Sequence, residues 1–386
     1  MNTVQLDQNY IAPTYKRFPV EIISGKGSLV RDAAGKEYID MGSGIAVTSF
    51  GIADDVWIAA VEEQIRSVQH MSNLYYTSPC ARLAESLCLR TGMSKVFFGN
   101  SGAEANECAI KVARKWAAEN KGPACSTIVT LENSFHGRTL TTLAATGQAH
   151  YHELYQPLTP GFEHIPAGDM NGLKSLCADG SVAAVLIECI QGEGGVVPLD
   201  PSFAAELEAF LKENNILLMV DEVQTGNGRT GKMYAYMHYG LHPDVVTTAK
   251  GLAGGLPIGA CLLGEKVKDV FTYGDHGSTF GGNPVSSAAA LSVINRLTDD
   301  FLSEVESKGS LLRSLLEGAP GILSVSGLGL MLGLKTVKPA ADVVKTCMDH
   351  GVLCLTAKDK VRLLPALNIP EELLRRAAEI ICAACM

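Results

Sequence analysis

Short apolar runs alternate with amphipathic stretches along most of this chain, and many of the runs end in a polar, glycine-rich segment. The runs Val182–Ile190, Ile216–Val220 and Asp244–Ala249 have the composition of strands buried on both faces of a sheet. Between them, stretches such as Ser202–Glu213 have the spacing of apolar residues that is typical of helices. Strands and helices that alternate in this order predict an α/β fold with a mainly parallel sheet.

The segments that follow the predicted strands are the candidate site, because ligands of parallel sheets bind at the carboxyl ends of the strands. The segments that carry suitable side chains are 100–103, 135–138, 191–193, 221–224 and residue 250. We expect all of them to lie along one edge of the sheet.

Two of these segments place an acid and a lysine at strand ends. Asp221 directly follows the run Ile216–Val220, and Lys250 follows Asp244–Ala249 and precedes several glycines. Pyridoxal phosphate requires such a pair, a lysine for covalent attachment and an acid beside the ring nitrogen. Taken alone, Asp221 is more simply explained as the cap of a turn and Lys250 as a solvated lysine. The residues of the other loops must therefore distinguish a cofactor site from these simpler interpretations.

A candidate anion site lies where a helix is expected to begin, within Gly99–Asn106; this helix continues to about Glu119. The short strand Lys95–Phe98 leads into Gly99–Asn106, where free backbone N–H groups at the helix start and the hydroxyl of Ser101 could bind a phosphate. An ordinary capped helix is the alternative interpretation.

The segment Ser134–Thr139 combines an aromatic ring, an imidazole and a guanidinium. Phe135 could stack on a planar ring, or it could be a core residue. Arg138 could bind a carboxylate with two parallel N–H groups. We interpret His136 as a hydrogen-bonded structural histidine, because nothing in the sequence pairs it with a nucleophile.

Four further polar positions belong to the candidate set. Glu193 lies in the glycine-rich Gln191–Gly195, and Ser278 with Thr279 lies next to glycines. Arg362 stands alone among apolar residues and needs an anionic partner, either Glu193 or a substrate carboxylate. A surface position on an edge strand is the alternative for Arg362.

The chain of 386 residues, 47% of them hydrophobic, is long enough for two domains. Short β-type runs and helices near the C-terminus predict a smaller α+β unit, which the N-terminal strands are expected to join. We therefore predict an arm with strands over residues 1–45, a large domain over 46–285 and a small domain over 286–386.

The composition of the chain limits which kinds of partner the protein is expected to bind. The net charge of −9 argues against nucleic acid as a partner. The eleven cysteines show no paired zinc-binding spacing, so no metal site is expected, and Cys382 with Cys385 is interpreted as helix packing. Free cysteines, no signal-peptide pattern and no apolar run of about 18 residues predict a cytoplasmic protein without a membrane partner.

Taken together, these segments resemble the class III, pyridoxal-phosphate-dependent aminotransferases. The similar motifs, in the order of that family, are Asn100–Glu107, Ser134–Thr139, Gln191–Gly195, Asp221–Gly226, Thr248–Leu252 and Gly277–Pro284. The chain departs from the family at Gly51–Asp55 and at Cys189, neither of which is expected to touch the chemistry. The resemblance implies a homodimer of fold-type I, with a large domain built on a mainly parallel seven-stranded sheet and a smaller α+β domain.

The resemblance also implies a role for each candidate residue at the cofactor. Lys250 would bind pyridoxal phosphate covalently and move the substrate proton, and Asp221 would keep the ring nitrogen protonated. Gln224 would bind the ring hydroxyl, and Phe135 would stack on the ring. The phosphate would be bound by Ser101, Gly102 and Ala103, with Thr279 reaching it from the partner subunit.

The remaining candidates are implied to bind substrates. Arg138 would bind a substrate carboxylate and Ser278 would line the substrate site. Arg362 would bind a carboxylate of 2-oxoglutarate, and Glu193 would pair with Arg362 when that substrate is absent. Such a switch lets one site accept an ω-amine donor and a keto acid in turn.

The segments Ser43–Val47 and Ser72–Tyr76 are similar to those of the subgroup active in arginine biosynthesis. This similarity implies transfer of the δ-amino group of N2-acetylornithine to 2-oxoglutarate, which gives N-acetylglutamate 5-semialdehyde and glutamate. Succinylornithine, succinyldiaminopimelate, ornithine and 4-aminobutyrate stay open as donors.

Other function classes fit the sequence less well. A class III aminomutase, racemase or decarboxylase stays open, although Glu193 and Arg362 favour a two-substrate reaction. A non-catalytic scaffold would leave the combination of Lys250, Asp221 and Gln224 unexplained. A dinucleotide-binding dehydrogenase is excluded because no strand, GxGxxG motif and helix follow one another.

Overall fold

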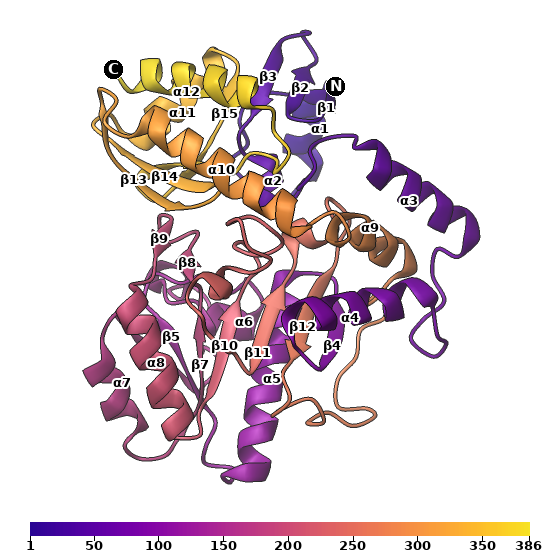
Figure 1. Cartoon of the computed structure of the whole chain (residues 1–386), viewed down its shortest axis with the longest axis vertical. Coiled ribbons are helices and arrows are strands. Elements are labelled where there is room, and N and C mark those ends of the chain that lie inside the picture. Colours follow the sequence, from indigo (N-terminus) through magenta and orange to yellow (C-terminus); the bar gives the residue numbers. More distant parts are fainter.

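The computed structural model describes all 386 residues, and its largest element is a seven-stranded sheet (Figure 1). The strands follow the order β4 (Lys95–Gly99), β12 (Gly259–Leu263), β11 (Val245–Thr248), β10 (Leu217–Asp221), β7 (Val182–Ile187), β5 (Thr127–Leu131) and β6 (Phe162–Ile165). Only β12 runs antiparallel to its neighbours. The predicted mainly parallel sheet is therefore confirmed.

Both faces of this sheet are covered by helices. In β10, Leu218 belongs to one core cluster and the adjacent Met219 belongs to a second cluster on the opposite face. The first cluster includes residues of α7 (Met170–Cys177) and α8 (Pro201–Glu213), and the second includes residues of α5 (Gly102–Asn120). Burial on both faces explains why the strands are apolar without alternation.

Strand β7 ends at Ile187 and not at Ile190, so this part of the sequence prediction is wrong. The next residue, Glu188, is buried and accepts two backbone N–H bonds from neighbouring loops, which turns the chain out of the sheet. The segment beyond it forms the short β8 (Ile190–Gln191), which pairs with β9 (Val197–Pro198).

Strand β6 was not predicted, because the stretch that precedes Gly168 has no continuous apolar run. It is an edge strand that pairs in parallel with β5, and only Ile165 of its residues is fully buried. An edge strand with little buried surface has almost no hydrophobic pattern from which it could be recognised.

Two further four-stranded sheets lie in the upper part of Figure 1. One consists of β1 (Ile22–Lys26), β2 (Leu29–Asp32), β3 (Glu37–Asp40) and β15 (Val352–Leu353), and the other of β13 (Ile322–Leu328), β14 (Met331–Thr336), β17 (Lys360–Leu363) and β16 (Leu355–Ala357). Because β3 pairs with β15, the strands near the N-terminus share a sheet with the C-terminal part. The expected smaller α+β unit is therefore present, whereas the boundaries at residues 45 and 285 stay predictions.

The remaining helices connect and cover these sheets. They are α1 (Thr3–Tyr10), α2 (Ser43–Ala46), α3 (Asp55–Ser67), α4 (Ser78–Thr91), α6 (Leu140–Ala145), α9 (Pro284–Ile294), α10 (Asp299–Leu316), α11 (Ala340–Asp349) and α12 (Glu371–Cys385), with the 3-10 turns η1 (Ala149–Tyr151), η2 (Ala235–His238) and η3 (Lys250–Leu252). No helix combines the length and the apolar composition needed to cross a membrane.

A buried arginine joins the upper sheets to the edge of the large one. Arg229 is 2% exposed, and its Nη1 donates to the carbonyls of Leu330 at 3.1 Å and Pro365 at 2.5 Å. These carbonyls flank β14 and β17, so the contact places β17 above the loop that follows β10. The hydrogen bonds of Arg229 thereby hold the C-terminal sheet against the segment that follows β10.

Candidate active site

A cavity of about 490 Å³ lies at the carboxyl edge of the seven-stranded sheet. Its volume is typical of small-molecule sites, and its wall includes the segments that follow β4, β5, β10 and β11. The predicted site residues that line it are Ser101, Gly102, Ala103, Phe135, Arg138, Asp221, Gln224 and Lys250. The predicted residues outside this wall are Glu193, Ser278, Thr279 and Arg362.

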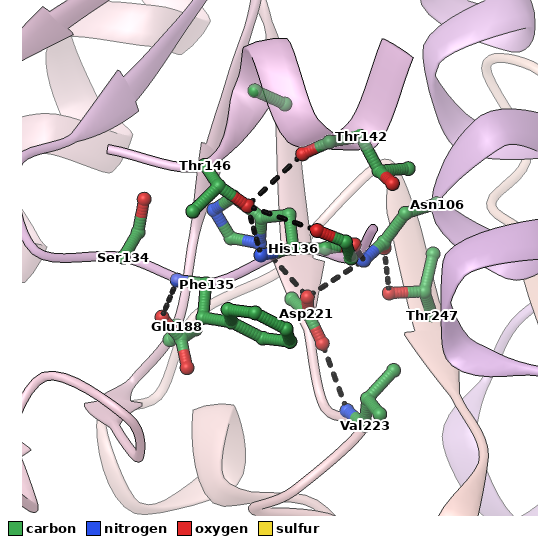
Figure 2. A network of polar contacts seen from close by, with 12 residues as sticks. Asn106, Ser134, Phe135, His136, Thr142, Thr146, Glu188, Asp221, Val223 and Thr247 are labelled. Atoms are coloured by element: carbon green, nitrogen blue, oxygen red, sulfur yellow. Dashed lines mark hydrogen bonds and ion pairs between the residues drawn. The ribbon is translucent and has the colours of Figure 1, made fainter. Parts of the chain in front are cut away.

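Asp221 ends β10 and is held by three hydrogen-bond donors (Figure 2). Its Oδ2 accepts from Asn106 Nδ2 and His136 Nδ1, both at 2.8 Å, and its Oδ1 accepts from the backbone N–H of Val223 at 2.9 Å. Thr247 donates to Asn106 Oδ1 at 2.7 Å, which turns the amide N–H groups of Asn106 toward Asp221. A carboxylate bound in this way keeps one orientation.

His136 is buried against Asp221, a contact that the sequence did not predict. Because the carboxylate can only accept, the proton of the neutral imidazole is assigned to Nδ1. The other ring nitrogen, Nε2, is buried without a partner, so the expected structural histidine is only half satisfied. Thr146 Oγ1 accepts the backbone N–H of His136 at 2.9 Å and fixes the loop below the ring.

Glu188 is a second buried carboxylate at a strand end, next to β7. Its Oε2 accepts the backbone N–H of Phe135 at 2.9 Å (Figure 2), and its Oε1 accepts that of Gly192 at 3.2 Å. Burial raises the pKa of Glu188 to about 7, with His136 and the two N–H groups opposing the rise and Asp221 adding to it. One carboxylate therefore joins the loop after β5 to the loop after β7.

Lys250 follows β11 at the start of η3 and has a φ of 45°. A left-handed backbone costs a residue other than glycine about 1–3 kcal/mol, and such strain is typical of functional sites. Asn227 Nδ2 donates to the carbonyl of Ala249 at 3.1 Å and supports this turn. Burial lowers the pKa of Lys250, and the nearby carboxylates of Glu193 and Asp221 oppose that shift.

The N-terminus of α5 faces the cavity. Ser101 is its N-cap, with Oγ accepting from the backbone N–H of Glu104 at 3.2 Å. The backbone N–H groups of Gly102 and Ala103 belong to the first turn and have no partner within the helix. A Cβ on Gly102 would lie 2.7 Å from a side-chain atom of Val223, so glycine is needed for the helix to approach the loop after β10. Free N–H groups at a helix start are able to bind an anion such as a phosphate.

Buried Arg362 and half-buried Glu193 form an ion pair at the edge of the cavity. Arg362 Nη1 lies 2.5 Å from Glu193 Oε1, and the same nitrogen donates to Gln224 Oε1 at 3.0 Å. Burial alone would raise the pKa of Glu193, but the charge and the hydrogen bond of Arg362 outweigh it, and the pKa lies below its ordinary value. Arg362 lies on β17, between β14 and β16, which rules out the surface position on an edge strand.

Arg138 lines the cavity and extends over two aromatic rings, of which Phe135 also lines the cavity and Tyr151 does not. Its Cζ lies 5.4 Å from the centroid of the Phe135 ring and 4.5 Å from that of Tyr151. The two rings meet edge to face, with their centroids 5.9 Å apart. No acidic side chain forms an ion pair with Arg138, so its guanidinium is free for an external carboxylate.

Several predicted positions lie away from the cavity of their own chain. Ser278 Oγ accepts from Asn100 Nδ2 at 3.1 Å, while Thr279 is exposed. Ile45 lines a separate groove of about 380 Å³. Tyr75 and Tyr76 are 63% and 108% exposed, so within one chain neither they nor Ile45 contact the candidate site.

Sequence reasoning missed three side chains of this region, Asn106, Glu188 and Tyr151. Two of them left a signal. Asn106 is a polar residue on the buried, alanine-rich face of α5, and Glu188 follows an apolar run just as Asp221 does. Nothing in the sequence pairs Tyr151 with Arg138, because their contact depends on how the intervening α6 folds back.

The class III aminotransferase family matches residues 10–385 of the chain. The chain is 51% identical over 379 residues to the acetylornithine aminotransferase of Haemophilus ducreyi, which covers 98% of this chain and 96% of that protein. The crystal structure of the ornithine aminotransferase from Toxoplasma gondii matches with a TM-score of 0.94 at 33% identity, covering 99% of this chain and 94% of that one. The N-acetylornithine aminotransferase from Stenotrophomonas maltophilia matches with a TM-score of 0.85 at 35% identity, covering 99% and 98%. With a family match over nearly its whole length, this chain belongs to the class III aminotransferases.

Proposed function

We propose that this aminotransferase moves the δ-amino group of N2-acetylornithine to 2-oxoglutarate, giving N-acetylglutamate 5-semialdehyde and glutamate. The observation that carries the proposal is one cavity that combines Lys250, Asp221 and the free start of α5 and that adjoins the Glu193–Arg362 pair. The choice of donor is supported by the acetylornithine aminotransferase of Haemophilus ducreyi, at 51% identity.

The residues at this cavity fit pyridoxal phosphate, which we propose as the cofactor. The free N–H groups of Gly102 and Ala103, with the Ser101 hydroxyl, suit its phosphate. A Cβ on Gly137 would lie 2.9 Å from the Cβ of Ala103. The loop after β5 can therefore lie this close to the start of α5 only because residue 137 is a glycine. When bound, pyridoxal phosphate would supply an aldehyde that takes up the amino group and a ring that withdraws electrons from the reacting carbon.

The side chains around the cavity would hold the cofactor ring and move the proton. Asp221, fixed by Asn106 and His136, would keep the ring nitrogen protonated, and Phe135 and Gln224 would contact the ring face and its hydroxyl. Lys250 would attach the cofactor and carry the proton that leaves Cδ of the donor. The lowered pKa of Lys250 favours the neutral amine that both tasks need.

The two arginines would recognise the substrates at opposite ends. Arg138 would bind the carboxylate that the donor and the acceptor both carry far from the reacting carbon. The reacting carbon of 2-oxoglutarate also bears a carboxylate, whereas that of the donor bears none. Arg362 would therefore bind 2-oxoglutarate in one half-reaction and return to Glu193 in the other.

We also propose a homodimer in which Thr279 reaches the phosphate in the partner subunit and Ser278 borders the substrate. Large apolar side chains close to these residues in sequence or in space are exposed, among them Leu74 at 87%, Tyr273 at 109% and Phe280 at 58%. Large apolar side chains left exposed in one subunit are typical of a subunit interface.

Ornithine is the second candidate donor, because the Toxoplasma gondii ornithine aminotransferase matches the whole fold with a TM-score of 0.94. The two donors differ at the α-nitrogen, which is a charged amine in ornithine and a neutral amide in N2-acetylornithine. Ile45 stands where ornithine aminotransferases usually carry tyrosine, which favours the acylated donor.

A donor panel tests the proposed activity. With 2-oxoglutarate as acceptor, we expect kcat/KM for N2-acetylornithine to exceed that for ornithine, 4-aminobutyrate and the succinylated donors by about tenfold, or about 1.4 kcal/mol. Lys250→Ala should abolish turnover and the absorbance band of lysine-bound cofactor. A tenfold lead for another donor would reassign the substrate, and full turnover by Lys250→Ala would contradict the proposed chemistry.

Glu193→Gln tests the arginine switch. Removal of the competing carboxylate should lower KM for 2-oxoglutarate about three- to tenfold, because Arg362 no longer gives up its ion pair with Glu193 to bind the substrate carboxylate. The conservative Arg362→Lys should raise the same KM and leave the KM of the donor nearly unchanged. Steady-state kinetics at varied donor and acceptor measure both constants, and equal changes for the two substrates would argue against a switch.

Glu188→Gln tests the connection between the two loops. Both partners of Glu188 are N–H donors, so the amide NH2 of glutamine would face one of them and leave it unsatisfied. We expect the Kd of pyridoxal phosphate to rise about tenfold. Folding raises the pKa of Glu188 from 4.5 to about 7, so the wild type loses stability as Glu188 ionises over that pH range. Glu188→Gln has no such ionisation. Its unfolding temperature should therefore rise relative to that of the wild type as pH increases from 5 to 8.

Glu222→Gln is the matched control for Glu188→Gln. Glu222 is equally buried and its pKa is also raised to about 7, but it accepts from Thr225 and Tyr236 behind the cavity. It should show the same pH trend in stability with an unchanged cofactor Kd. A Glu188→Gln variant whose Kd matches this control would refute the connection.

Thr279→Ala tests the shared site. Sedimentation should give a dimer for wild type and variant, while the variant loses one phosphate contact and binds the cofactor about fivefold more weakly. Fluorescence titration of the cofactor-free protein measures this affinity. A wild-type monomer that binds the cofactor with full affinity would overturn the shared site.

A further inference from the structure

The aromatic partner of Arg138 that does not belong to the cavity wall is Tyr151. Its ring centroid lies 4.5 Å from Arg138 Cζ, closer than that of Phe135 at 5.4 Å. Arg138 Nη2 is 3.4 Å from the Tyr151 hydroxyl, which is long for a hydrogen bond. The contact is therefore mainly that of a cation with an aromatic ring.

Tyr151 is held in place by the same loop that carries Arg138. Its backbone N–H donates to the carbonyl of Gln148 at 3.0 Å, and Gln148 Nε2 donates to the carbonyl of Ser134 at 3.0 Å. The hydroxyl of Ser134 accepts the backbone N–H of Gly147, also at 3.0 Å. The turn η1 and the segment Ser134–Arg138 are thus joined directly, and the His150 ring packs on Tyr151 with centroids 3.9 Å apart.

Arg138 needs such a support. Its side chain is exposed and has no acidic partner, so many rotamers would be open to it, and ordering a free arginine costs conformational entropy. Phe135 lines the cavity and is the ring that would contact the cofactor. Tyr151 does not line the cavity, so it can hold the guanidinium without touching cofactor or substrate.

We propose that Tyr151 is a positioning residue that orders Arg138 for the substrate carboxylate and thereby makes this carboxylate a requirement for good substrates. This inference rests on the substrate role proposed for Arg138. The ligands concerned are acylated amino acids and dicarboxylates, whose carboxylate lies far from the reacting carbon. The ring, more than the hydroxyl, provides the support.

The test uses the holoenzyme and N-acetylnorvaline, which keeps the carboxylate and the acetyl group of the donor but lacks the δ-amine and cannot react. Calorimetry gives its Kd. We expect Tyr151→Leu to raise this Kd about three- to tenfold, which corresponds to the loss of one cation–ring contact and some ordering. Tyr151→Phe keeps the ring and should restore the Kd to about that of wild type.

Turnover separates positioning from a general structural defect. Tyr151→Leu should raise KM for N2-acetylornithine and leave kcat unchanged. With N-acetylputrescine, the same amine donor without its carboxylate, kcat/KM should be equal for wild type and Tyr151→Leu. The matched control is Tyr155→Leu, an exposed tyrosine of the same segment that has no contact with Arg138 and should change none of these constants.

Arg138→Ala distinguishes failure of this inference from failure of the proposed function. If Arg138→Ala leaves the Kd of N-acetylnorvaline unchanged, the carboxylate role of Arg138 is wrong and the inference falls with it. If Arg138→Ala weakens binding but Tyr151→Leu does not, the role of Tyr151 alone is wrong. If both weaken it, Tyr151→Leu should have no further effect in the Arg138→Ala background.

Two other results would overturn the inference. A Tyr151→Phe variant as weak as Tyr151→Leu would make the hydroxyl the essential group. A Tyr151→Leu variant with a raised Kd for pyridoxal phosphate would indicate a disturbed loop and not a misplaced Arg138.

Discussion

The hydrogen bonds that hold the Asp221 carboxylate are the constraint on which the site depends. A carboxylate at 4% exposure is costly unless donors surround it, and here the donors come from three different parts of the chain: Asn106 on α5, His136 after β5 and Val223 after β10. The sheet brings these three segments to one edge. In this way the fold stabilises its buried charge and orients it in one step, and the cavity forms around it.

Two further carboxylates near strand ends, Glu188 and Glu193, also accept hydrogen bonds, but their pKa values shift in opposite directions. Glu188 after β7 binds only backbone N–H groups, so it connects loops without neutralising a cation, and burial raises its pKa to about 7. Glu193 pairs with a full positive charge on Arg362, and its pKa is lowered. The two carboxylates therefore differ in pKa because one faces backbone N–H groups and the other faces a guanidinium.

Much of the site was predictable because its parts are local in sequence. A strand end, a glycine-rich turn and a helix start at Ser101 or Lys250 are determined by neighbouring residues, and parallel strands place such ends on one edge. The resemblance of these motifs to class III aminotransferases then indicated how they combine. The predicted end of β7 was wrong because the buried acid Glu188 follows the strand. Strand β6 was not predicted because an edge strand with little buried surface has no clear hydrophobic pattern.

The sequence by itself determined the α/β fold class, the order of the loops around the cavity and the positions of Asp221 and Lys250 at two of the strand ends, because apolar runs and turn residues act over short distances. Only the tertiary structure decided that His136 and Asn106 hold Asp221, that Glu188 joins two loops, that Arg362 is buried on Glu193 and that Tyr151 supports Arg138. Each of these contacts joins residues that are distant in the chain or separated by a folded turn. Their partners are selected by how layers pack, which no local pattern of residues records.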